Sequence, residues 1–161
     1  MYPQSHFLLP FVLGLGFVKL EVLDIKLALI AGLLGVLIDI DHYIAFLYYY
    51  KDFNIKHVWN AAVVKGDPIE RTFIHHKIGF VVMTKIIEVL LLFNPLYSLV
   101  LALGYYTHLL LDYIHLIIPL QTFKHPKKIV FVEDGFTVKL PVYEILFDSM
   151  LIFLIVMYYL S

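Results

Sequence analysis

Hydrophobic residues occur in five long stretches, separated by segments where charged and polar residues concentrate. A helix needs about 20 apolar residues to cross the hydrocarbon core of a bilayer, because each residue adds about 1.5 Å. The second and fourth stretches meet this length, whereas the first and third are short for a span. The pattern predicts an all-α, multi-pass helical membrane bundle of about five segments, at residues 7–22, 27–50, 78–93, 96–118 and 142–160.

Two polar segments interrupt this pattern and carry most of the positive charge. Residues 51–77 contain five Lys or Arg residues, and residues 119–141 contain four. Within the second segment, two apolar runs around Glu133-Asp134-Gly135 predict a small β-hairpin. The positive-inside rule then predicts a multi-pass protein of the cell membrane, with the N-terminus and the hairpin in the cytoplasm and the C-terminus outside.

The composition supports the same class of protein. The chain has 161 residues, of which 61% are hydrophobic and 16% are charged, and its mean hydropathy is +0.87. An ordinary soluble domain is nearer half apolar and a quarter charged. The length predicts one integral membrane domain over residues 1–161, with the candidate metal ligands at about 5–118 and the hairpin and last helix at 121–160.

Net charge and cysteine content narrow the chemistry further. The formal net charge is −1, so no nucleic acid partner is expected. The chain has no cysteine, which excludes disulfides and thiolate ligands. Any metal ion must therefore be held by His, Asp or Glu, a donor set that favours zinc, manganese, iron or magnesium.

Ionisable side chains interrupt the apolar stretches, although a charge at membrane depth costs several kcal/mol unless it is paired, hydrated or bound to a metal. Counting along the predicted spans at 1.5 Å per residue puts His42 and Asp112 roughly 22–24 Å from the outer edge. His6, His75 and His108 fall near the same level. The convergence of groups from four segments predicts a shared metal site in the cytoplasmic half.

Local spacing agrees with such a site. His108 and Asp112 are four residues apart and share a helix face, as do Asp39 and His42, which are three apart. One helix supplies two ligands to one ion in this way. Asp41 points elsewhere on an ideal helix, where it reaches a second metal ion, holds the second nitrogen of a ligand or caps a local break.

Four segments resemble the YdjM-type family of LexA-binding, inner-membrane-associated metal-dependent hydrolases. His6 resembles the N-terminal His of that family, and Ile38-Asp39-Ile40-Asp41-His42 resembles its Pro-Asp-x-Asp-His segment, with Ile38 in place of Pro. Glu70-Arg71-Thr72-Phe73-Ile74-His75 resembles its His-Arg-Gly-x-Thr-His segment, with Glu70, Thr72 and Ile74 as departures. Gly104 to Asp112 resembles its Gly-x-x-x-His-x-x-x-Asp segment closely. The likeness spans roughly residues 5–118 and implies a metal-dependent hydrolase.

The leading hypothesis is a membrane-embedded hydrolase that uses a metal-activated water on a phosphoester or lipid-like substrate. Its cofactor is one or two divalent ions, zinc before manganese, iron or magnesium. Asp41 or Asp39 orients the water or accepts its proton, and Arg71 either grips a phosphate or is a plain positive-inside arginine. The partners are membrane lipids and an amphiphilic substrate. The expected ligands are His42, His75, His108 and Asp112, followed by His6 and Asp39.

Two rival functions use the same residues. Intramembrane His and Asp also mark the pathway of a divalent metal or proton transporter, although the outer halves of the second and fourth stretches are almost purely apolar. In a structural membrane protein these groups merely pair helices. Lys85 and Glu88, three residues apart in the third stretch, have two open interpretations. They form an internal ion pair that lowers the cost of both charges, or Lys85 faces the site and neutralises a substrate anion.

Overall fold

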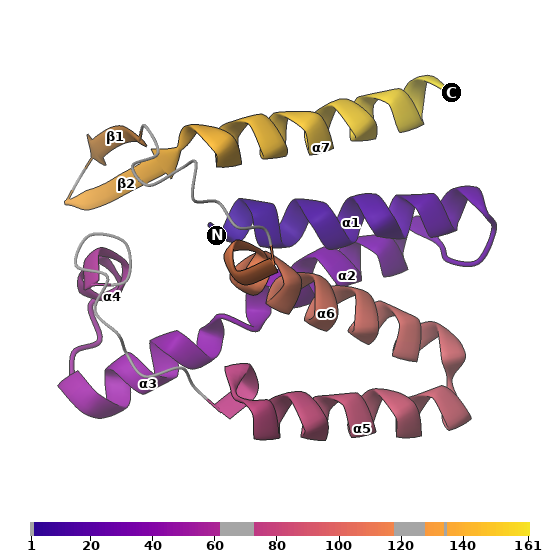
Figure 1. Cartoon of the computed structure of the whole chain (residues 1–161), viewed down its shortest axis with the longest axis horizontal. Coiled ribbons are helices and arrows are strands. Elements are labelled where there is room, and N and C mark those ends of the chain that lie inside the picture. The colour runs from indigo at the N-terminus through magenta and orange to yellow at the C-terminus, as the bar shows by residue number, and fades with distance from the viewer. Residues whose placement is uncertain (1, 62–72, 118–127, 134) are drawn as a thin grey trace.

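The computed structural model describes residues 2–61, 73–117, 128–133 and 135–161. Within these ranges the chain forms a bundle of helices with a two-stranded antiparallel sheet at one end (Figure 1). The mostly helical class and the hairpin are therefore confirmed. The bundle helices are α1 (Pro3–Lys19), α2 (Ile25–Leu37), α5 (Lys77–Phe93), α6 (Pro95–Ile117) and α7 (Val142–Leu160). The other elements are α3 (Ile40–Tyr50), α4 (Ile55–Asn60), the 3₁₀ helix η2 (Phe73–His75), β1 (Lys128–Glu133) and β2 (Phe136–Pro141).

Small residues let α1 and α2 pack closely at the centre of the bundle. On α2, Ala28, Ala31, Gly32 and Gly35 are all buried, and their spacing of three or four residues puts them on one face. A Cβ added at Gly14 of α1 would lie 2.8 Å from Ala28 Cβ, so this crossing requires glycine. Close approach through small residues is typical of helices in lipid, where burial of apolar side chains between helices supplies little driving force.

Capped turns bring the chain back to the same end of the bundle. Asp24 Oδ1 accepts a hydrogen bond from Leu27 N at 2.8 Å and starts α2 after the α1–α2 turn. Asn94 Oδ1 accepts from Tyr97 N at 3.2 Å, and Pro95 occupies the first position of α6. Helices α1 and α2 are therefore antiparallel, and so are α5 and α6. Figure 1 shows that the end of α2 and the start of α5 lie at the same end of the bundle.

The second apolar stretch is interrupted where the sequence predicted one continuous helix. It runs from Ile25 to Tyr50 but breaks at Ile38–Asp39, between α2 and α3. Asp39 is the N-cap residue of α3, yet its side chain makes no capping hydrogen bond. Its carboxylate instead faces His108 on α6, so the break delivers an acid to the interior of the bundle.

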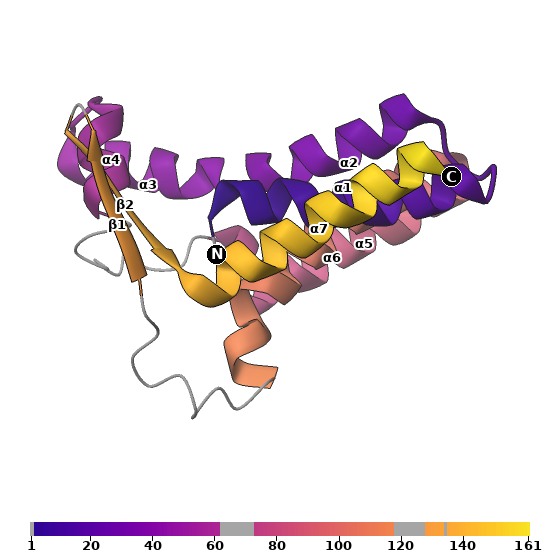
Figure 2. The ribbon, with the colours of Figure 1, turned by 90° about the horizontal axis from the view of Figure 1, so that it is seen from above.

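Helix α7 lies alongside α1 in both views (Figures 1 and 2). Glu144, which is 1% exposed, accepts hydrogen bonds from Tyr2 N at 2.5 Å and from Ser5 Oγ at 2.9 Å. Ser5 Oγ also contacts Asp148 Oδ1 at 2.7 Å. The sequence assigned no role to this last helix, and the structure shows that it holds the N-terminal turn of α1.

The hairpin and α4 form one unit at the end of the bundle. Ile129 pairs with Leu140 across the two strands, and Gly135 supplies the positive φ of +81° at the turn. Trp59 Nε1 on α4 donates to Thr137 O of β2 at 2.9 Å. Asn60 bonds to the turn on both sides, through Gly135 O at 2.6 Å and Thr137 N at 3.0 Å.

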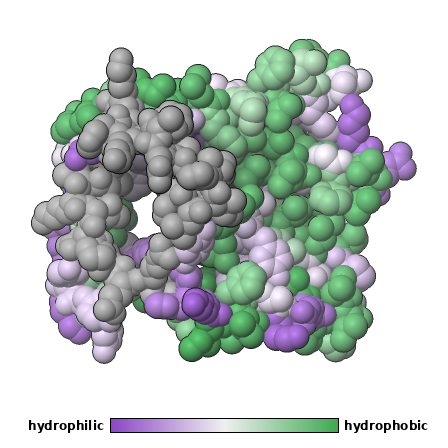
Figure 3. Space-filling model, in the orientation of Figure 1, coloured by the Kyte–Doolittle hydropathy of each residue, from purple (hydrophilic) through white to green (hydrophobic). Residues whose placement is uncertain are grey.

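Two helical stretches among the described residues are long and apolar enough to cross a membrane, Ile25–Tyr50 and Val142–Leu160. Helices α1 and α5 have 17 residues each, which is about 25 Å and shorter than the hydrocarbon core of about 30 Å. Outside the grey region, the face in Figure 3 is largely hydrophobic. These features support membrane association, while the five-segment topology and its orientation remain predictions.

Candidate metal centre

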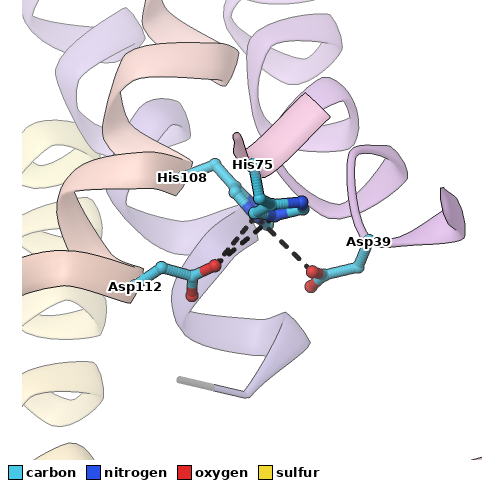
Figure 4. A group of neighbouring side chains, drawn as sticks. All are labelled: Asp39, His75, His108 and Asp112. Carbon is cyan, nitrogen blue, oxygen red and sulfur yellow. Dashed lines mark hydrogen bonds and ion pairs between the residues drawn. The ribbon is translucent and has the colours of Figure 1, made fainter. Parts of the chain in front are cut away.

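Three parts of the chain that are far apart in sequence meet beside the α2–α3 break (Figure 4). Asp39 lies at this break, His75 ends η2, and His108 and Asp112 lie on successive turns of α6. One potential ligand atom from each residue lies within 4.8 Å of all the others. Three of the residues placed at one level by counting, His75, His108 and Asp112, thus lie close together in the structure, and Asp39 joins them; these four are here called the four-residue group.

Several distances within the four-residue group are close to those around a single ion. The Nε2 atoms of His75 and His108 are 2.9 Å apart. Asp112 Oδ2 lies 3.5 Å from the first and 3.4 Å from the second, and Asp39 Oδ1 lies 3.5 Å from His108 Nε2. Ligand atoms that bind zinc tetrahedrally at about 2.0–2.1 Å are about 3.3–3.4 Å from one another. The four-residue group could therefore hold a divalent ion, with the two Nε2 atoms moving slightly apart.

The second ring nitrogen of each histidine already has an acceptor. His108 Nδ1 donates to Gly35 O at 2.7 Å, and His75 Nδ1 donates to Asp41 Oδ2 at 3.0 Å. In the neutral rings the two Nε2 atoms then carry lone pairs that face each other, and a shared proton or a cation relieves their repulsion. Histidines that bind metals are typically oriented by such an acceptor. The contact of Asp41 with His75 has the geometry of the second role predicted for Asp41.

Gly35 joins the packing of α1 to the orientation of His108. A Cβ added at Gly35 would collide with His6 O and lie 3.0 Å from Pro10 Cγ. Only glycine therefore allows α1 to approach α2 here, and the carbonyl of the same glycine accepts the bond from His108. A backbone carbonyl has no signature in the sequence, so this contribution was not predicted.

Two tyrosines of α6 hold the segment that carries His75. Tyr105 donates from its hydroxyl to Ile74 O at 3.0 Å, and Tyr113 donates to His75 O at 2.9 Å. The helix that supplies His108 and Asp112 thus also fixes the backbone of the third ligand. Neither tyrosine was predicted to support the site. Their positions close to His108 and Asp112 in the sequence were the only feature that pointed to such a role.

His6 lies against the four-residue group. Its ring stacks on that of His108 with centroids 4.1 Å apart, and its Nε2 is 3.3 Å from Asp112 Oδ1. The side chain is fully buried, and neither ring nitrogen has a hydrogen-bond partner among the described residues. Asp112 Oδ2 faces His75 and His108, which leaves Asp112 Oδ1 facing His6. A second ion bound between His6 Nε2 and Asp112 Oδ1 would therefore give that buried nitrogen a partner.

His42, predicted as a ligand together with Asp39, lies beside the four-residue group. The His42 ring centroid is 4.7 Å from that of His75, and its Nε2 is 4.0 Å from Asp39 Oδ1. His42, Asp41 and His75 form a second potential ligand set, but His75 Nδ1 is bonded to Asp41. The helix was predicted to be unbroken, whereas the break at Ile38–Asp39 places Asp39 next to His108 and His42 next to His75.

The imidazoles are buried, whereas the carboxylates reach the surface. The His108 and His75 side chains are 0% and 3% exposed, and those of Asp112 and Asp39 are 25% and 31% exposed. One side of the four-residue group is therefore accessible to water or to a substrate. A four-coordinate ion held by all four groups would be closed, as in a structural metal site, whereas an ion held by three of them would keep one position for water.

Two parts of the sequence interpretation find no test here. Arg71, predicted to grip a phosphate, and Glu70, which replaces a family His, lie outside the described residues. No family model, no curated protein and no solved structure matches this chain. The resemblance to the YdjM-type family therefore stays a prediction from its motifs, and the four-residue group stands on its own geometry.

Proposed function

We propose that this protein is a membrane-associated, metal-dependent hydrolase. The observation that carries the proposal is a group of four potential ligand atoms within 4.8 Å of one another, from two buried imidazoles and two partly exposed carboxylates. A catalytic site needs a coordination position for water, so the proposal is that three of the four groups bind the ion and that one partly exposed carboxylate, Asp39 or Asp112, leaves the fourth position to water. Two nitrogen and two oxygen donors suit zinc first, and then manganese, iron or magnesium.

The residues around this group have distinct roles in the proposal. A divalent ion held by this group would lower the pKa of a bound water molecule and would polarise the ester bond that is hydrolysed. Asp39 and Asp112 form the exposed side, so either carboxylate is placed to accept a proton from water. Asp41 keeps the His75 ring in position, and His6 adds a donor atom for a second ion.

A lipid-like substrate is supported by the surroundings of the group. Asp39 lies within the apolar stretch Ile25–Tyr50, one of the two candidate spans. The other candidate span, α7, is tied through Glu144 to the turn of α1 that carries His6. An amphiphile in the bilayer therefore approaches the group without crossing a long stretch of water. A phosphoester is the proposed bond, with Arg71 as the residue that binds its phosphate.

The distribution of polar residues favours hydrolysis over transport. Lys26 is the only charged residue of α2, and it lies at the start of that helix. Between Pro95 and Gly104 of α6 the polar side chains are those of Tyr97 and Ser98, and Ser98 donates to Ile87 O at 2.8 Å. A pathway for ions needs polar groups across the whole bilayer. The helices leading away from the four-residue group offer few.

Elemental analysis combined with turnover tests the proposal. The wild type is compared with His108→Ala and Asp112→Ala, and Asp52→Asn serves as a carboxylate control outside the four-residue group. We expect bound zinc in the wild type and the control, and its loss in the other two variants. Hydrolysis of phosphoester and carboxylester amphiphiles in detergent should follow the metal content. Bound metal without turnover, together with cation flux into vesicles that His108→Ala abolishes, would show a transporter instead.

A further inference from the structure

One surface of α5 places charged and apolar side chains next to each other. Lys85 Nζ and Glu88 Oε2 form an ion pair at 2.6 Å, and the two side chains are 70% and 55% exposed. The internal ion pair predicted from the sequence is thus confirmed. A groove beside it, here called the α5 groove, is lined by Lys85 and by Val81, Val82, Ile86, Val89, Leu90 and Phe93.

Neither water nor lipid satisfies this surface. In water, the α5 groove would leave apolar side chains such as Val89 and Phe93 uncovered, at 53% and 82% exposure. In lipid, Lys85 lies eight residues from each end of α5, which is about 12 Å and beyond the reach of its side chain. An ion pair facing hydrocarbon is costly. A protein surface that carries apolar side chains around a complementary pair of charges would cover the apolar side chains of the α5 groove and would also pair with Lys85 and Glu88.

Within the described part of the chain, α5 is an edge helix. It packs mainly against α6 and η2, and Figure 1 shows it on the border of the bundle, with α6 on one side only. Thr84, also on α5, is turned toward α6 and receives a hydrogen bond from the Tyr106 hydroxyl at 3.1 Å. Thr84 of α5 is thus bonded within the chain, whereas the Lys85–Glu88 pair faces outward.

We propose that the α5 groove and its ion pair bind the same surface of a second copy of this chain. In the proposed dimer, a two-fold axis relates the two copies. A half-turn about this axis reverses the direction from Lys85 to Glu88, as seen along the axis. Lys85 of each copy then meets Glu88 of the other, and the four charges alternate around the axis. The axis runs along the helices, so both copies keep the same orientation in a membrane. Two-fold dimers with self-complementary surfaces are the commonest oligomers, and this proposal stands independently of the hydrolase.

Cysteine cross-linking tests the contact directly. The chain has no cysteine, so each single-cysteine variant reports without background. Val89 lines the α5 groove and Leu91 does not, although both are 53% exposed on the same helix. On oxidation in membranes we expect disulfide-linked dimers from Val89→Cys and little cross-linking from Leu91→Cys. Equal cross-linking of the two variants, or capture of a different protein by Val89→Cys, would overturn the proposal.

Charge reversal separates pairing from folding. Lys85→Glu alone and Glu88→Lys alone each bring four like charges together, so the Kd of the dimer should rise at least about tenfold, or by about 1.4 kcal/mol. The double variant Lys85→Glu/Glu88→Lys restores the alternation and should restore the dimer. Light scattering in detergent measures the mass, and elemental analysis of each variant is expected to give the wild-type metal content. A monomeric wild type, or a double variant no better than the single ones, would refute the dimer.

Discussion

Replacing Asp41 by asparagine distinguishes a group that binds a metal ion from one that only pairs helices. Asp41 Oδ2 accepts the Nδ1–H of His75 at 3.0 Å, and the Asp41 side chain is 13% exposed. Asp41→Asn preserves the shape of the side chain but removes the negative charge that strengthens His75 Nε2 as a donor to a metal. Loss of such a partner lowers metal affinity by about 10–100-fold, which corresponds to about 1.4–2.7 kcal/mol.

Asp52 provides a matched control for this measurement. It pairs with His57 at 2.5 Å between Oδ2 and Nδ1, and the two side chains are 34% and 61% exposed. The backbone N–H of Asn54, and then His57, hold the pKa of the Asp52 carboxyl below its usual range. Asp52→Asn thus removes the same kind of acid–histidine pair, but at a place outside the four-residue group.

Competition with a chromophoric chelator gives the zinc Kd of the wild type and both variants. We expect a weaker Kd for Asp41→Asn and an unchanged Kd for Asp52→Asn. If Asp41→Asn binds zinc as tightly as the wild type, or if both variants weaken binding equally, then Asp41 does not act on a metal-binding histidine. Circular dichroism checks that each variant keeps its helices.

Three further outcomes follow from the packing of the site. Gly35→Ala would force a Cβ onto the α1 backbone and should lower the free energy of unfolding by at least about 1–3 kcal/mol in denaturant titration, whereas Gly16→Ala, where the space is open, should not. Zinc at about 100 times its Kd should stabilise the protein by about 2.7 kcal/mol in thermal unfolding, and a zinc effect that persists in His108→Ala would contradict the site. Tyr113→Phe removes the hydroxyl that donates to His75 O at 2.9 Å. The variant should lose about 0.5–1.5 kcal/mol of unfolding free energy and bind zinc more weakly. An unchanged zinc affinity would show that this hydrogen bond does not position His75.

The lengths of the apolar runs predicted most of the helices. The last helix begins after Pro141 and covers Val142–Leu160 as expected; α5 differs from the prediction by one residue at its start, and α6 by one residue at each end. Helix α1 begins earlier than predicted, at Pro3, because its first turn is held by Glu144 of α7. Such a contact between chain ends has no local signal in the sequence.

The ligand residues were predicted more completely than their supports. His75, His108, Asp112 and Asp39 were all among the candidates, since ionisable groups in apolar stretches are rare and costly. Gly35 O, Tyr105 and Tyr113 were missed because a carbonyl or a tyrosine in a membrane-like helix is unremarkable by itself. Their roles depend on which elements lie opposite them.

The sequence by itself determined that the chain is mostly helical and apolar and that imidazoles and carboxylates gather at one level of the bundle. Periodicity and run length are local properties, and the penalty for a charge in an apolar environment applies whatever the fold. Only the tertiary structure decided which of these groups meet. The break at Ile38–Asp39 turned Asp39 rather than His42 toward His108, and the close approach of α1 over Gly35 brought His6 against Asp112. Helix packing is set by contacts between residues distant along the chain, so the ligand set could not be read from spacing alone.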